Sequence, residues 1–236
     1  MSATSLAIAA DGVHLSFDGT NQVLSDVTLH VRQGEFVSLV GPSGCGKTTL
    51  LNLAAGLVAH TGKGSLTVGG QAPRQGNPQV GYMLARDSLM PWKTALGNAM
   101  FGMEVRGVPR AQAEERARAM LQEVGLAGFE NALPKALSHG MRQRVALART
   151  FAMGSPLLLM DEPFGALDAL TRAKLQDELL EIVARTQSTV VMVTHDVDEA
   201  VLLSDKIVMM TNGPAATIGE VLSVDLPRPR QRVELA

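Results

Sequence analysis

The chain has 236 residues, of which 46% are hydrophobic and 19% are charged, and its formal net charge is −2. This composition is typical of a folded globular protein and excludes a disordered one, and the length suffices for one large domain or two small ones. Because the balance of charge is slightly acidic, the chain has no basic field, and we expect no nucleic-acid partner.

Two further observations indicate the cellular compartment in which the chain is expected. Cys45 is the only cysteine, so an internal disulfide cannot form, which fits a reducing environment. No apolar run reaches the roughly 18–20 residues that a membrane-spanning helix needs, and the first residues lack the basic leader of a signal peptide. We therefore expect a cytoplasmic protein that meets a membrane only through a partner.

The first seventy residues have the pattern of short strands joined by turns. Val13–Phe17 and Val27–Val31 alternate between apolar and polar residues, as half-buried antiparallel strands do. Gly64–Gly70 resembles another strand that ends in glycines. The pattern predicts an antiparallel β subdomain at the N-terminus.

Three later runs are almost continuously apolar, namely Phe36–Val40, Leu157–Asp161 and Thr189–His195. Such runs are typical of strands buried on both faces, as in a parallel sheet that carries helices on each side. Each run is followed by a loop of polar residues or by a loop that contains glycine. In an open α/β sheet the ligand lies at the carboxyl ends of the strands, so these loops are the expected site.

Between about residues 84 and 154 the pattern becomes helical. In the stretch that follows Pro109, the residues Ala117, Met120, Leu121 and Val124 share one face, and Gly125 follows where a helix would end. We predict a single domain over residues 1–236. Its core and β subdomain comprise about residues 1–84 and 155–236, and a helical subdomain of about residues 85–154 is inserted between them.

The nine residues "GPSGCGKTT" follow an apolar strand and precede a helix, and they fit the phosphate-loop pattern G-x-x-x-x-G-K-[ST]. Glycines allow a tight turn whose backbone N–H groups face the phosphates of a nucleotide, and the helix N-terminus adds positive potential. The alternative is a glycine-rich turn with an exposed lysine. The predicted nucleotide-binding residues are Gly41, Pro42, Ser43, Gly44, Cys45, Gly46, Lys47, Thr48 and Thr49. We also expect the Cys45 thiol to be reactive, since it lies near Lys47.

The motif and the strand end at Asp161 together predict hydrolysis of ATP with Mg²⁺. Lys47 would neutralise charge on the β- and γ-phosphates, while the hydroxyl of Thr48 and the carboxylate of Asp161 would hold the metal. Glu162 comes one residue later, where a base can polarise the attacking water. An isolated acidic pair at a strand end is usually a solvated loop, but the phosphate loop makes the metal role more probable.

His195 ends the third apolar run, in "VMVTHD". An isolated histidine at such a place is more often a structural or loop residue. Because His195 lies at the carboxyl end of the same predicted sheet, we expect it to contact the γ-phosphate or to orient Glu162.

Four motifs in order, "GPSGCGKTT", "LSHGMRQR", "LLLMDEPFGALD" and "VTHD", resemble those of the nucleotide-binding subunits of ABC transporters. The resemblance covers nearly the whole chain and implies a P-loop NTPase core of the ABC type. It also implies a head-to-tail dimer of two copies, in which Ser138 and Gly140 of one copy reach the γ-phosphate bound by the other.

Ser138 also precedes a helix as an N-cap, which would leave free N–H groups facing that phosphate. Met141, Val145, Ala148 and Ala152 form the expected buried stripe of the helix, and its arginines lie mostly off that stripe. A basic helix that grips nucleic acid and a plain amphipathic surface helix are the alternatives for this segment.

The same resemblance gives roles to two further residues. Asp168, in "GALD", matches the key position of the loop that links the two ATP sites. Phe17 matches the aromatic residue that stacks on adenine, since stacking needs only a π-face, and its alternative is a core strand residue.

The sequence departs from the family pattern at two places. Ala85 stands where the family usually has a glutamine that relays the nucleotide state to the membrane partner, and Arg86 or Asp87 would have to compensate. His139 replaces the first glycine of the usual pair in the signature motif. These changes bear on coupling and rate more than on ATP binding.

Residues 89–108 and the tail "LPRPR" (Leu226–Arg230) resemble the nitrate, sulfonate and taurine group of importers. The resemblance implies an ATPase at the cytoplasmic face of the cell membrane, bound to permease subunits and served indirectly by a solute-binding protein. A subunit for an importer of thiamine precursors and a nucleotide switch with little turnover are the alternatives.

Overall fold

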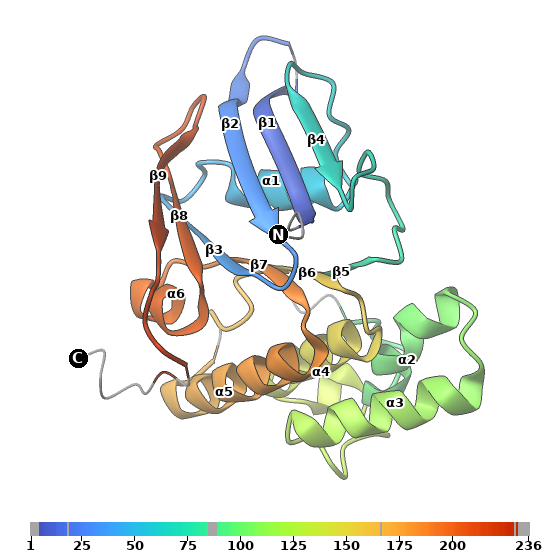
Figure 1. The fold of residues 1–236 in the computed structure, drawn as a ribbon. Coiled ribbons are helices and arrows are strands. Elements are labelled where there is room, and N and C mark those ends of the chain that lie inside the picture. Colours follow the sequence, from blue (N-terminus) through green and yellow to red (C-terminus); the bar gives the residue numbers. More distant parts are fainter. Residues whose placement is uncertain (1–4, 18, 85–88, 166, 229, 231–236) are drawn as a thin grey trace.

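The computed structural model describes residues 5–17, 19–84, 89–165, 167–228 and 230 (Figure 1). Its strands are β1 (Leu6–Ser16), β2 (Gln22–Arg32), β3 (Phe36–Val40), β4 (Ser65–Val68), β5 (Val80–Met83), β6 (Leu157–Asp161), β7 (Thr189–Val193), β8 (Lys206–Met210) and β9 (Ile218–Ser223). Its helices are α1 (Lys47–Ala54), α2 (Ala95–Val105), α3 (Arg110–Glu123), the 3₁₀ turn η1 (Pro134–Ala136), α4 (His139–Ala152), α5 (Ala169–Thr186) and α6 (Val197–Leu203).

The larger sheet has the strand order β5-β6-β7-β3-β8-β9 and is parallel except for its last pair, β8 and β9. The three apolar runs that predicted a buried parallel sheet are its central strands β6, β7 and β3. The α/β fold class is therefore confirmed. Because these three strands are neighbours, their carboxyl ends lie together and bring distant parts of the chain to one edge.

Side chains of the central strands alternate between two hydrophobic cores. Leu157 and Leu159 pack with helix α1 and the smaller sheet, whereas Leu158 and Met160 pack with the helices on the other face. Figure 1 shows α1 between the two sheets and α4 and α5 on the opposite side of the larger sheet. Continuous apolar strands were needed because both faces are covered.

The smaller sheet is antiparallel, with the order β2-β1-β4, as the alternating patterns predicted. Its first strand is longer than predicted, because it begins at Leu6 and ends at Ser16. Alanines at positions 7 and 10 are buried there, although they are weak indicators of a strand. The predicted strand end at Phe17 was wrong, since this residue lies beyond β1.

The helical stretch contains α2, α3 and α4, which pack together below the larger sheet (Figure 1). Helix α3 follows Pro109 and buries Ala117 and Leu121, and its C-cap residue Val124 is also buried, as predicted. Met120 of the predicted face is only partly buried. Strand β5 was missed, because four residues before a helical region give little periodicity. The division of the chain into subdomains stays a prediction.

Among the described residues, none of the helices has the length and apolar character to cross a bilayer.

Candidate functional site

The phosphate-loop sequence connects the end of β3 with the first turn of α1. Gly46 is the N-cap of α1 with a φ of 99°, a left-handed conformation that favours glycine. A Cβ on Gly46 would lie 2.8 Å from the Leu24 side chain, so the loop also needs a small residue there. No side chain caps the first N–H groups of α1, which leaves them available to an anion.

Lys47 is not the exposed lysine of the alternative interpretation, because only 5% of its surface is exposed. Its Nζ donates hydrogen bonds to the carbonyl oxygens of Gly41 and Pro42, at 2.7 and 2.8 Å. The ammonium group is thus held inside the curve of the loop, where a bound phosphate would be its natural partner.

The two predicted metal ligands lie next to each other. The Thr48 hydroxyl donates to Asp161 Oδ2 at 2.9 Å, although 113 residues separate them in the chain. Asp161 is 4% exposed, and burial is the main cause that raises the pKa of its carboxyl group above the usual value. The charge of Glu162 raises this pKa further, while the Thr48 hydrogen bond and Lys47 lower it.

This pair of oxygen donors fits Mg²⁺. The described residues contain no group of three or more His, Cys, Asp or Glu side chains that could enclose a metal ion. Mg²⁺ is usually bound by one or two protein oxygens together with water and substrate phosphates. A hydroxyl and a buried carboxylate beside a phosphate loop supply those two oxygens.

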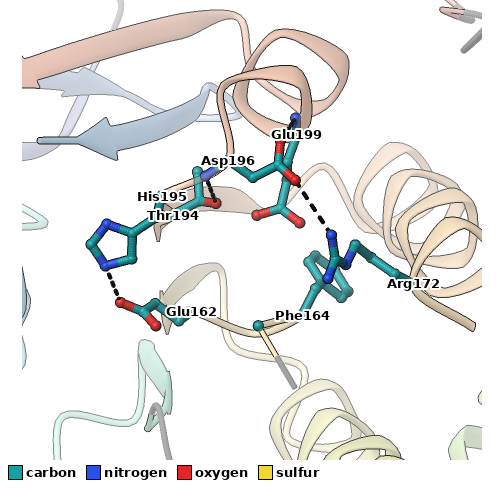
Figure 2. Close-up of a pocket in the computed structure, with 8 residues that line it drawn as sticks. Glu162, Phe164, Arg172, Thr194, His195, Asp196 and Glu199 are labelled. Carbon is teal, nitrogen blue, oxygen red and sulfur yellow. Dashed lines mark hydrogen bonds and ion pairs between the residues drawn. The ribbon is translucent and has the colours of Figure 1, made fainter. Parts of the chain in front are cut away.

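The side chains of Glu162 and His195 are in contact, and His195 Nε2 lies 2.6 Å from Glu162 Oε1 (Figure 2). Glu162 has a φ of 50°, a left-handed conformation that costs a residue with a side chain roughly 1–2 kcal/mol. Its backbone N–H donates to the carbonyl of Val193 at the end of β7. This hydrogen bond and the turn after β6 aim the carboxylate at the histidine.

One pocket joins the phosphate loop to Glu162 and His195. Its lining residues are Val23, Ser43, Gly44, Gly46, Lys47, Thr48, Thr49, Glu162 and His195. The structure therefore brings together six of the nine predicted phosphate-loop residues with Glu162 and His195, the two predicted catalytic residues of the later strands. Val23 on β2 was missed, because nothing in its local pattern distinguishes it from other strand residues.

A second pocket shares Glu162 and His195 and contains polar residues that sequence reasoning missed (Figure 2). Arg172 Nη1 lies 3.4 Å from Asp196 Oδ2, and Arg172 Nη2 donates to the carbonyl of Leu167 at 3.2 Å. Arg172 thus connects the segment before Asp168 with the residue after His195. Such contacts depend on the packing of α5 against the β7–α6 loop and leave no local sequence signal.

Glu199 is a buried carboxyl group in the same pocket. It is 6% exposed, and Gln176 Nε2 donates to its Oε1 at 2.7 Å. Burial is the main cause that raises the pKa of Glu199 above its usual value, and hydrogen bonds from Thr194 and Gln176 oppose this shift. The group therefore holds its proton to a higher pH than an exposed glutamate.

Ser138 is the N-cap of α4, as predicted, and its Oγ accepts a hydrogen bond from the N–H of Met141 at 3.2 Å. Ser138 is exposed, and Gly140 lies half-buried in the first helical turn. In the described part of the chain, neither residue is among those that line the two pockets. The structure does not bring these residues to the chain's own phosphate loop.

The buried face of α4 is wider than the predicted stripe. Val145, Ala148 and Ala152 are buried as expected, whereas Met141 is only partly buried. The additional buried residues are Gln143, Ala146, Leu147, Thr150 and Phe151. The helix lies against α2, α3 and β5, so it is covered on more than one side.

Two arginines of α4 donate hydrogen bonds to backbone groups within the chain. Arg142 donates to the carbonyl of Leu137 at 2.9 Å, and Arg144 donates to the carbonyls of Val124 and Gly125 at 3.3 Å. These hydrogen bonds hold η1 and the end of α3 against α4. The groups that suggested a basic helix therefore contribute to internal packing.

Asp168 and Phe17 are both exposed. Asp168 is the N-cap of α5 and accepts from the N–H of Thr171 at 3.0 Å, and this hydrogen bond is the main cause that lowers its pKa. Phe17 is 65% exposed, so the alternative that made it a core residue was wrong. It is not among the residues that line the phosphate pocket. The adenine-stacking role stays a prediction.

The expectation for Cys45 needs correction. Its side chain is 1% exposed and packs with the hydrophobic core beneath the loop, so the thiol is not presented to solvent. Within the loop its backbone N–H donates to the carbonyl of Pro42 at 3.3 Å, and its Sγ accepts from Lys47 Nζ at 3.8 Å. Ala85, Arg86 and Asp87 lie outside the described residues, and the predictions made for them stay untested.

Comparisons with known proteins agree with this geometry. The sequence model of the family described as "ABC transporter" matches residues 24–165. The nitrate import ATP-binding protein NrtC of Synechococcus elongatus is 48% identical over 98% of this chain, and the bicarbonate transport ATP-binding protein CmpC of Synechocystis is also 48% identical over 98%. This chain spans 36% and 35% of their lengths, about a third.

Other relatives match in length as well. The nitrate transport protein NasD of Klebsiella oxytoca is 45% identical over 97% of this chain and 89% of its own. Among solved structures, a dimeric post-hydrolysis state of the ATP-binding cassette MJ0796 bound to ADP and Pi has a TM-score of 0.81. It is 28% identical and covers 92% of this chain and 98% of its own. The chain belongs to the ABC transporter family.

Proposed function

We propose that the chain is the ATP-hydrolysing subunit of an ABC importer that takes up a small inorganic or sulfonated anion. The observation that carries the proposal is one pocket that holds Lys47, Thr48, Glu162 and His195. These residues supply a phosphate-binding cation, a metal-binding hydroxyl and a carboxylate–imidazole pair. Hydrolysis of a phosphoanhydride needs this set of groups.

In this proposal the loop binds phosphate in two ways. Backbone N–H groups at the start of α1 face the phosphate oxygens, and Lys47 exchanges its contacts with the carbonyls of Gly41 and Pro42 for contacts with phosphate. Thr48 and Asp161 would hold Mg²⁺, which would supply positive charge beside the phosphate oxygens. The remaining loop residues and Phe17 fix the position of the nucleotide.

Glu162 acts as the base. Its carboxylate orients the attacking water and accepts a proton from it, while His195 holds the carboxylate in place through the contact at 2.6 Å. Such general-base assistance contributes typically about 10²–10⁴-fold to a rate. The left-handed turn at Glu162 supports this role, because strained backbone is often concentrated at functional sites.

A second copy of the chain completes the site. Ser138 and Gly140 are exposed or half-buried at the start of α4, and in the described chain they do not line the pocket of their own copy. The dimeric arrangement of the solved cassette MJ0796 supports a dimer here. Ser138 and Gly140 then face the γ-phosphate bound by the partner, and Asp168 contributes to the link between the two sites.

The transport role is proposed from the relatives. NrtC and NasD are named for nitrate, and CmpC is named for bicarbonate. All of these solutes are small anions, which supports a small anion over a thiamine precursor. The chain would bind permease subunits at the cytoplasmic face of the membrane, and a solute-binding protein would deliver the anion.

The test is phosphate release by the purified chain with ATP and Mg²⁺, beside the variant Glu162→Gln, which has nearly the same shape but no base. We expect steady turnover in the first and loss of about 10²-fold or more in the second, with nucleotide binding retained. Nucleotide binding without turnover by the unaltered chain would instead support the switch. The anion is then identified by the transport assay of the chain assembled with its permease.

A further inference from the structure

Two arginines of the C-terminal tail, Arg228 and Arg230, lie against the end of α6 and make an extensive set of hydrogen bonds there. A helix leaves its last carbonyl groups without intrahelical donors. In α6 and its C-cap residue, all four of these carbonyl oxygens accept from Arg230 or Arg228. The distances are 2.8 Å to Val201, 3.3 Å to Leu202 and 2.6 Å to Ser204 from Arg230, and 2.8 Å to Leu203 from Arg228.

Both arginines are fixed at further points. Arg230 Nη2 donates to the carbonyl of Val224 at 3.0 Å, the residue that follows β9. Arg228 forms an ion pair with Asp205 at 2.7 Å, and Asp205 in turn accepts from the N–H of Phe36 at the start of β3. The cations therefore join the end of α6 to the larger sheet, where positive charge is also favoured by the helix dipole.

The other end of α6 forms part of the candidate active site. The helix begins after Asp196, whose side chain caps it by accepting from the N–H of Glu199 at 3.1 Å. His195 is the residue before Asp196 and contacts Glu162. Because α6 has only seven residues, too few to be stable alone, its position depends on the groups that hold its two ends.

We propose that Arg230, assisted by Arg228, is a positioning residue for ATP hydrolysis. By binding the carbonyl end of α6, it sets the place of His195 at the opposite end of this short helix, and with it the contact between His195 and Glu162. The inference rests on the proposed ATPase function. The two arginines of "LPRPR" thereby have a physical role at the site.

The kinetic test compares Arg230→Ala with Arg116→Ala, which removes an exposed arginine of α3 far along the chain from the site. We expect kcat to fall about tenfold in Arg230→Ala with KM for ATP within about twofold, because the phosphate loop is untouched. Arg116→Ala should behave like the unaltered chain. Arg228→Ala, which removes one of the four carbonyl contacts, should show a smaller loss of kcat. An unchanged kcat in folded Arg230→Ala would overturn the proposal.

A second measurement does not depend on turnover. In protein with ¹⁵N-labelled histidine, the ring signals of His195 are assigned by their loss in His195→Ala. Arg230→Ala should shift the His195 signals and leave those of His14 and His60, which lie in or near the smaller sheet, unchanged. Unshifted His195 signals in the folded variant would refute the positioning role.

The two measurements also separate the possible failures. If the unaltered chain hydrolyses no ATP, the proposed function fails, and the histidine signals still decide whether the tail positions His195. If Arg230→Ala does not fold, Arg228→Ala and Arg230→Lys provide a milder comparison, because Arg228→Ala keeps the three carbonyl contacts of Arg230 and Arg230→Lys keeps the positive charge. Folded variants in which the His195 signals do not move would then count against the proposal.

Discussion

His195 Nε2 lies 2.6 Å from Glu162 Oε1, at the edge where β6 and β7 end side by side. The contact joins two residues that lie 33 positions apart in the sequence (195 − 162 = 33). Their strands are neighbours in the sheet, which brings the two residues to the same edge. This arrangement predicts that the two side chains act on hydrolysis as one unit.

Combining His195→Ala with Glu162→Gln tests that unit. Each single variant should lower kcat strongly, and the double variant should be no slower than Glu162→Gln alone, because the histidine acts through the carboxylate. The measurement is single-turnover hydrolysis with excess enzyme. If the two losses multiply instead, His195 has an independent role such as direct contact with the γ-phosphate.

The hydrogen bond between Thr48 and Asp161 predicts a dependence on the metal concentration. Thr48→Val removes the hydroxyl and keeps the shape, so the Mg²⁺ concentration for half-maximal hydrolysis should rise about tenfold or more. Thr48→Ser keeps the hydroxyl and serves as the matched control, with a small change at most. Equal Mg²⁺ requirements in the two variants would show that the hydroxyl does not bind the metal.

The exposed position of Ser138 predicts complementation between subunits. Ser138→Arg and Lys47→Ala should each be nearly inactive alone. An equal mixture should regain about a quarter of the activity, because half of the dimers then contain one intact composite site. The assay is ATPase activity against mixing ratio. Substantial activity in either variant alone, or in a trapped monomer, contradicts the composite site.

The burial of Glu199 predicts a pH dependence of stability. Its pKa is raised in the folded chain, so between the ordinary value of 4.5 and the raised one the folded state binds more protons than the unfolded state. The stabilisation is therefore present at pH below 4.5 and is lost as the pH rises through the folded pKa. The variant Glu199→Gln still accepts a hydrogen bond from Gln176 but does not titrate. Its stability should therefore not fall in this way as the pH rises.

The measurement is the free energy of unfolding of both proteins from pH 4 to 8 by denaturant titration. As the pH rises, the free energy of unfolding of Glu199→Gln should increase relative to that of the unaltered chain. Asp177→Asn on α5 is the control for the loss of one negative charge from an exposed side chain. A difference that does not vary with pH would contradict the raised pKa.

Sequence alone determined the parts of this protein whose chemistry is local. The phosphate loop is contiguous from Gly41 to Thr49, and its glycines, lysine and threonine act within one turn between a strand and a helix. Continuous apolar strands identified the parallel sheet, because burial on both faces removes the alternation. The acidic pair after β6 and the histidine after β7 followed from the rule that ligands lie at carboxyl ends of strands.

Only the tertiary structure decided the contacts between distant elements. The link from Arg172 to Asp196 and the cap that Arg230 forms on α6 join segments about 24 to 29 residues apart, and neither has a periodic or local signature. The structure also showed that Cys45 is buried and Phe17 exposed. Burial and pairing of this kind depend on how sheets and helices pack, and a side chain's neighbours across that packing are set in space rather than along the chain.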